Sequence, residues 1–126
     1  VGEEFQLQQI SCKAADKGKP ETITVLATFP PTAADKVDYQ PSIHCTLYMQ
    51  MKVEYLGGKT AEGENKHEAK VTFAYSKDGK KFTPCGEPHT MRQGKWVGSK
   101  VGFCAAEPAG KKVRGWADID WFRITK

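Results

Sequence analysis

At 126 residues and 14.0 kDa, the chain has the usual size of one domain and buries roughly two-thirds of its unfolded surface on folding. A hydrophobic fraction of 39% beside 27% charged residues argues against intrinsic disorder. The formal net charge is +4, but the lysines are scattered over turn sequences, which argues against a nucleic-acid surface. No window reaches the ~18 apolar residues of a membrane helix. We therefore expect one domain over residues 1–126, with neither nucleic acid nor a membrane as partner.

The first predicted elements are strands over residues 5–10 and 21–29. In the second, apolar residues from Ile23 to Phe29 alternate with threonines, and β-branched residues at this period are typical of strands. The clearest pattern covers residues 43–55. Its apolar residues occupy every second position: Ile43, Cys45, Leu47, Met49, Met51, Val53 and Tyr55. Period two predicts one long strand with this face buried.

Residues 69–76 form the next predicted strand. Asp78 and Gly79 then predict a tight hairpin turn, because both residue types accept positive φ angles, and residues 81–83 pair back across it. Further strands are expected over residues 95–106 and 115–125. Since no segment shows the period of an amphipathic helix, the sequence predicts an all-β antiparallel β-sandwich.

The four cysteines, Cys12, Cys45, Cys85 and Cys104, are widely spaced and include no C-x-x-C pair. Zinc ligands usually come in close pairs, so a structural zinc site is not expected. Two disulfides and four free thiols both remain open.

Two aspartates near the end of the chain are the candidate metal ligands. Asp118 and Asp120 are two residues apart on a predicted strand, so they share a face. Two such carboxylates can accept structural hydrogen bonds, hold Ca²⁺ or act as an acid and a base. Structural hydrogen bonds are the favoured role of these two carboxylates, and Ca²⁺ is the metal that they could hold. No cofactor is required.

Aromatic side chains suggest a sugar-binding surface, because the apolar face of a pyranose stacks on Trp or Tyr. The three tryptophans are candidates, and Tyr48 lies on the otherwise polar face of the predicted strand over residues 43–55. We take Tyr48, Trp96 and Trp116 as the candidate carbohydrate-binding residues. Burial in the core of the sandwich is the competing explanation for each tryptophan.

Three motifs in order resemble a known family. They are Tyr-Ser-Lys-Asp-Gly at 75–79, Trp-Val-Gly-Ser-Lys-Val-Gly at 96–102 and Ala-Asp-Ile-Asp-Trp-Phe at 117–122. Together they resemble the C-terminal β-sandwich of glycoside hydrolase family 43 β-xylosidases and α-L-arabinofuranosidases. The resemblance covers nearly the whole chain. Ile119 stands where the family has Phe, which exchanges one apolar residue for another.

The resemblance implies a concanavalin A-like jelly roll, and we expect this chain to lack its N-terminal strands. It also implies that the catalytic carboxylates lie on a separate β-propeller, so no residue here inherits a catalytic role. The expected partner is that propeller or a complementary chain, with xylan or arabinoxylan oligosaccharides as further partners. The expected location is periplasmic or secreted.

The sequence and the resemblance together suggest three candidate functions. The leading one is a non-catalytic accessory β-sandwich that supports the catalytic propeller of an enzyme degrading plant polysaccharides. The alternative is an independent carbohydrate-binding module. A self-contained hydrolase that uses Asp118 and Asp120 is disfavoured, because simple strand alternation explains both residues.

Overall fold

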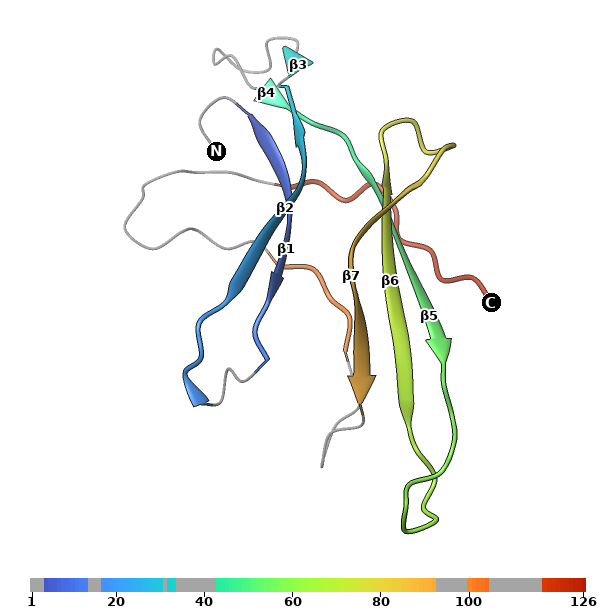
Figure 1. The fold of residues 1–126 in the computed structure, drawn as a ribbon. Helices are drawn as coiled ribbons and strands as arrows, with labels where there is room; N and C mark the ends of the chain where they lie inside the picture. Colours follow the sequence, from blue (N-terminus) through green and yellow to red (C-terminus); the bar gives the residue numbers. More distant parts are fainter. Residues whose placement is uncertain (1–3, 14–16, 31, 34–42, 93–99, 105–116) are drawn as a thin grey trace.

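The computed structural model describes residues 4–13, 17–30, 32–33, 43–92, 100–104 and 117–126. Within them, seven strands follow one another along the chain: β1 (Phe5–Ser11), β2 (Thr22–Phe29), β3 (Thr32–Ala33), β4 (Ile43–His44), β5 (Tyr48–Tyr55), β6 (Glu68–Ser76) and β7 (Thr83–Arg92). They form sheets of order β1-β2, β3-β4 and β5-β6-β7, and every pairing is antiparallel (Figure 1). The prediction of an all-β antiparallel sandwich is confirmed.

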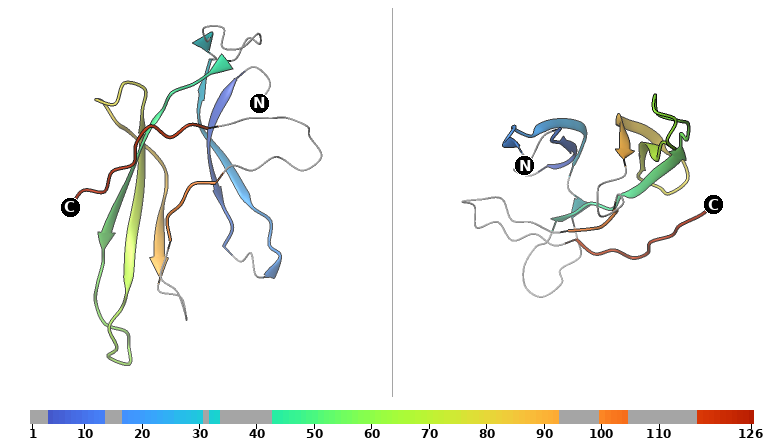
Figure 2. Two further views of the ribbon diagram at one scale, coloured as in Figure 1. Left: turned by 180° about the vertical axis from the view of Figure 1, so that it is seen from behind. Right: turned by 90° about the horizontal axis from the view of Figure 1, so that it is seen from below.

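The two larger sheets form separate layers (Figure 2). Alternation places one apolar row of β6 on the face that meets β2, and this row contains Val71 and Tyr75. Among the described residues, the buried hydrophobic side chains are Phe29, 3% exposed, and Val71, 2% exposed. Phe29 meets Tyr75 edge to face with ring centroids 5.7 Å apart. The core between the layers therefore centres on the end of β2 and on β6.

A second contact between the layers comes from a bulge in β7. Opposite Thr72 of β6, β7 carries three residues, 86–88, where a regular strand would have one. The side-chain amide of Gln9 in β1 binds this bulge twice: Nε2 donates to the Glu87 carbonyl at 2.8 Å, and Oε1 accepts from the Glu87 amide at 2.8 Å. A side chain of one sheet thus replaces the strand neighbour that the bulge lacks.

The strand predicted over residues 43–55 is divided, since β4 and β5 are separated by residues 45–47. Its apolar row is not buried along β5, where Met49 is 54% and Val53 is 51% exposed. This part of the prediction was wrong because β2 packs on β6 and on β7, one edge strand of the sheet, while β5 is the other edge strand. Alternation tells which residues share a face but not whether another layer covers it.

Two further expectations need correction. The β6–β7 connection spans residues 77–82 and is not a two-residue turn, although Gly79 has the expected positive φ of 71°. The strands predicted near the end of the chain are not formed in residues 100–104 and 117–126. The remaining residues of those predicted strands, 95–99, 105–106 and 115–116, lie outside the described part. A strand needs partners for its backbone groups, and none of the three described sheets pairs with residues 100–104 or 117–126.

Candidate functional site

Functional side chains gather at one end of the three-stranded sheet, where β5 begins, β6 ends and β7 begins. We call this region the hairpin end and define it as Tyr48, residues 75–83 and Trp121. Because Tyr48 is paired with Ser76 and Met49 with Tyr75, Tyr48 and Tyr75 lie on opposite faces of the sheet. The hairpin end therefore offers two surfaces joined by one loop.

The Ser76 and Asp78 side chains fix the conformation of that loop. Ser76 is buried, and its Oγ donates to Asp78 Oδ1 at 2.9 Å while accepting from the amides of Asp78 and Gly79 at 3.3 and 3.0 Å. Asp78 Oδ1 also accepts from the amides of Lys80 and Lys81, at 2.8 and 3.0 Å. These two amides, followed by the Ser76 hydroxyl, lower the pKa of Asp78 below its usual value. Asp78 is thus an anionic loop anchor rather than a proton donor.

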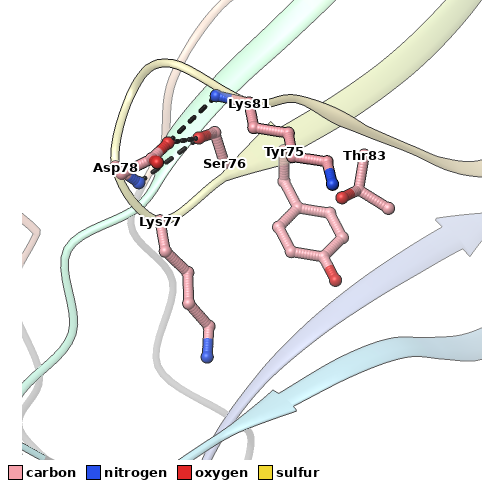
Figure 3. A pocket seen from close by; sticks show the side chains of 6 residues that line it. All are labelled: Tyr75, Ser76, Lys77, Asp78, Lys81 and Thr83. Carbon is pink, nitrogen blue, oxygen red and sulfur yellow. Dashed lines mark hydrogen bonds between the residues drawn. The ribbon is translucent and has the colours of Figure 1, made fainter.

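On the Tyr75 face, the loop borders an open, shallow pocket of about 330 Å³. Its lining residues are Tyr75, Ser76, Lys77, Asp78, Lys81 and Thr83. Figure 3 shows the Lys77 and Lys81 side chains on opposite sides of the Tyr75 ring, with the Thr83 hydroxyl close to the end of Lys81. The pocket thus combines an aromatic wall, three hydroxyl groups, one carboxylate and two ammonium groups.

The Lys77 ammonium also contributes to the contact between the layers. Its Nζ lies 4.9 Å from the centroid of the Phe29 ring, a distance at which a cation is attracted to an aromatic face. Phe29 in turn packs on Tyr75. The pocket therefore rests on the buried centre of the sandwich, although its mouth is open to solvent.

On the opposite face, Tyr48 meets Trp121 of the C-terminal segment. Their ring centroids are 6.3 Å apart at an angle of 45°, and Trp121 is 61% exposed. The loop supports Tyr48 from behind, since a Cβ on Gly79 would lie 3.0 Å from Tyr48 Cε1. The guanidinium of Arg123 lies 5.7 Å from the Trp121 ring centroid. This pair presents aromatic surface beside a positive charge.

The structure describes three of the five predicted site residues. Tyr48 lies at the hairpin end, whereas Trp96 and Trp116 lie outside the described residues. Asp118 and Asp120 are exposed in an extended segment that belongs to no described strand, so the predicted strand face does not hold them. In the described part of the chain, no group of three His, Cys, Asp or Glu side chains could hold a metal ion. Ca²⁺ binding by these aspartates stays a prediction.

Sequence reasoning missed the pocket on the Tyr75 face. Lys77 and Lys81 are among the lysines of turn sequences, and both are exposed, but no local pattern shows that Lys77 lies over Phe29, which is 48 residues away. The available signal was the Tyr-Ser-x-Asp-Gly motif itself. It fixes the loop and thereby the lysines on either side of Asp78.

The four cysteines are free in this structure. Cys12, Cys45 and Cys85 are half-buried, and Cys104 is exposed. Burial raises the pKa of the Cys85 thiol, which therefore stays protonated at neutral pH. Across the described residues, we find no helix with the length and apolar character needed to cross a bilayer.

Comparison with known families decides the classification. The family model of the β-xylosidase C-terminal concanavalin A-like domain matches residues 8–125. The chain belongs to this family. The resemblance to glycoside hydrolase family 43 is thereby confirmed, and membership implies a catalytic domain as partner in the parent protein. A search of curated proteins finds no match, and neither does a search of solved structures.

Proposed function

We propose that this chain is a non-catalytic accessory β-sandwich that supports the catalytic propeller of a plant-polysaccharide-degrading enzyme of the β-xylosidase or arabinofuranosidase type. The observation that carries the proposal is the uncovered apolar row on β5. Met49, Met51 and Val53 share the face that is buried at Val71 on β6, yet they are 54%, 38% and 51% exposed. A continuous apolar face that is half covered favours a second layer or a neighbouring domain over the other half.

The size of the expected effect follows from these exposures. Complete burial of a Val or Met side chain contributes roughly 1.5–3 kcal/mol. Because about half of each side chain is already hidden, covering the row contributes roughly 1 kcal/mol per residue. A contribution of about 1 kcal/mol from each of the three side chains is enough for an interface within one parent protein, where the two domains are already held together.

A charge placed on this row tests the proposal. Val53→Lys in the parent protein is expected to lower the thermal midpoint of the catalytic domain and to make the connection between the domains more sensitive to protease. Gln50→Lys is the matched control, since it places the same charge on the same strand but on the opposite face. Equal behaviour of the two variants would contradict a supporting role for this face.

The alternative function, an independent carbohydrate-binding module, is favoured by the pair of half-buried Tyr48 and exposed Trp121. Its expected ligands are xylan or arabinoxylan oligosaccharides, which would stack on these rings. Calorimetric titration with xylo-oligosaccharides should then show saturable binding that Trp121→Ala abolishes. Phe122→Ala is the control, because Phe122 is equally exposed but packs on Phe103. If the unmodified protein shows no heat of binding, the carbohydrate-binding function is excluded and the accessory role is the one that stands.

Two smaller proposals accompany this one. Family membership supports a periplasmic or secreted location, which fractionation of the source cells would test. Ca²⁺ binding by Asp118 and Asp120 would appear as a calcium-dependent rise in the unfolding midpoint that Asp118→Asn removes. A midpoint that is indifferent to calcium would dismiss it.

A further inference from the structure

The pocket on the Tyr75 face is lined by two cations, Lys77 and Lys81, and by one anion, Asp78, so two positive charges and one negative charge leave a formal charge of +1. Asp78 is the one acid in its lining, and its Oδ1 is already bound by Ser76 and by the amides of Lys80 and Lys81. Neither Lys77 nor Lys81 forms an ion pair with a described residue. At the opposite end of the same sheet, by contrast, the Lys66 ammonium lies 3.6 Å from Glu68. The pocket thus has a net attraction for a negative charge.

The remaining walls suit a small polar ring. The Tyr75 ring provides an apolar surface, and the hydroxyls of Tyr75 and Thr83 can donate or accept hydrogen bonds. A volume of about 330 Å³ is at the lower end of the roughly 300–1,000 Å³ that ligand pockets span. One monosaccharide unit is therefore a better match than a long segment of a polymer.

The hydrogen-bond donors of the pocket narrow the choice of anion. Phosphate sites use Lys as well as Arg, but they commonly add a nest of free backbone amides around the phosphate. Here the amides of Lys80 and Lys81 are occupied by Asp78, and no Arg lines the pocket. Two separate ammonium groups on either side of an aromatic ring fit a single negative charge on a ring-shaped ligand.

We propose that this pocket binds a uronic acid, a sugar that carries a carboxylate. Lys77 and Lys81 contact the carboxylate, the Tyr75 ring packs against the sugar, and the hydroxyls of Tyr75 and Thr83 meet the hydroxyls of the ligand. The proposal goes beyond the accessory role and does not depend on it. It also concerns the opposite face of the sheet from the Tyr48–Trp121 pair.

The test is calorimetric titration of the full chain with glucuronate, with glucose as the neutral match and inorganic phosphate as the ring-free anion. We expect glucuronate to bind, more weakly as the salt concentration rises, and glucose and phosphate to bind far less. Lys77→Met and Lys81→Met should each weaken the glucuronate Kd roughly two- to five-fold, the range for solvent-exposed charge pairs. Methionine keeps the apolar stem of the lysine and removes the ammonium, so Lys77→Met also loses the cation–π contact with Phe29.

Lys70→Met is the matched control, because it removes the same charge from an exposed position of β6 outside the pocket. Lys81→Arg should retain most of the affinity, and circular dichroism checks the fold of each variant. Four results would overturn the proposal: no glucuronate binding at low salt, equal binding of glucose, equal or tighter binding of phosphate, or an equal loss in Lys70→Met.

Discussion

Gly86 offers the sharpest test of how the two layers are joined. It has a φ of 70°, and a Cβ there would lie 2.9 Å from Gln9 Oε1. That oxygen cannot simply move aside, because it accepts the Glu87 amide while the same side chain donates to the Glu87 carbonyl. Gly86→Ala should therefore strain the backbone and break the Gln9 contact together.

The magnitude follows from these two contributions. A left-handed conformation costs an alanine about 1 kcal/mol, and two solvent-exposed hydrogen bonds contribute roughly 0.5–1 kcal/mol each. Gly86→Ala should thus lower the free energy of unfolding by roughly 2–3 kcal/mol. Gly18→Ala is the matched control, since Gly18 has a φ of 65° with nothing within 4 Å of a Cβ, and it should lose only about 1 kcal/mol.

Urea unfolding followed by circular dichroism measures these differences at equilibrium. Repeating Gly86→Ala in the Gln9→Ala background completes a double-mutant cycle. There the substitution should cost only the free energy of the left-handed backbone, so the coupling energy between the two positions should be about 1–2 kcal/mol. If Gly86→Ala costs no more than Gly18→Ala, or costs the same with and without Gln9, the proposed link between the layers is refuted.

The hairpin loop and the cysteines allow three further tests. Ser76→Ala removes a buried hydroxyl with three hydrogen bonds and should cost about 1–3 kcal/mol in urea unfolding, whereas exposed Ser11→Ala should change little; equal losses would contradict the anchoring role. Because the pKa of Asp78 is lowered on folding, its stabilisation is full above its unfolded pKa and is lost as the pH falls through the lower folded value. The urea midpoint of the unmodified protein should therefore fall more than that of Asp78→Asn between about pH 6 and about pH 3, and parallel curves would exclude this linkage. Iodoacetamide should label Cys85 more slowly than exposed Cys104, because burial raises the pKa of the Cys85 thiol and limits access, and mass spectrometry would reveal the opposite order.

Apolar alternation located three strands but misjudged the longest pattern, residues 43–55, which the structure divides into β4 and β5. The predicted ranges 5–10, 21–29 and 69–76 agree with β1, β2 and β6 to within one residue at each end. β7 was missed because Pro84, Gly86 and Pro88 are typical of breaks in a strand. These three residues are tolerated because β7 is an edge strand of its sheet, and Gly86 and Pro88 lie in its bulge.

The candidate site was predictable only in part, for a related reason. Tyr48 stood out because it is the aromatic residue on a polar strand face, and the Asp78-Gly79 sequence correctly marked the turn. The partner of Tyr48, Trp121, is 73 residues away, and the cations beside Tyr75 depend on a loop that side-chain hydrogen bonds shape. Such long-range placement is decided by how the sheets pack, which alternation does not encode.

The double hydrogen bond between Gln9 and Glu87 has a consequence for hydrogen exchange. The amide proton of Glu87 is held by a side chain of the other layer rather than by a neighbouring strand. This proton can exchange with deuterated solvent only when the layers separate or when the Gln9 side chain leaves the Glu87 amide. Neighbouring amides of β7 exchange when the β6–β7 hydrogen bonds open. One amide in the middle of a bulge thus reports on how often the contact between the layers breaks at Gln9.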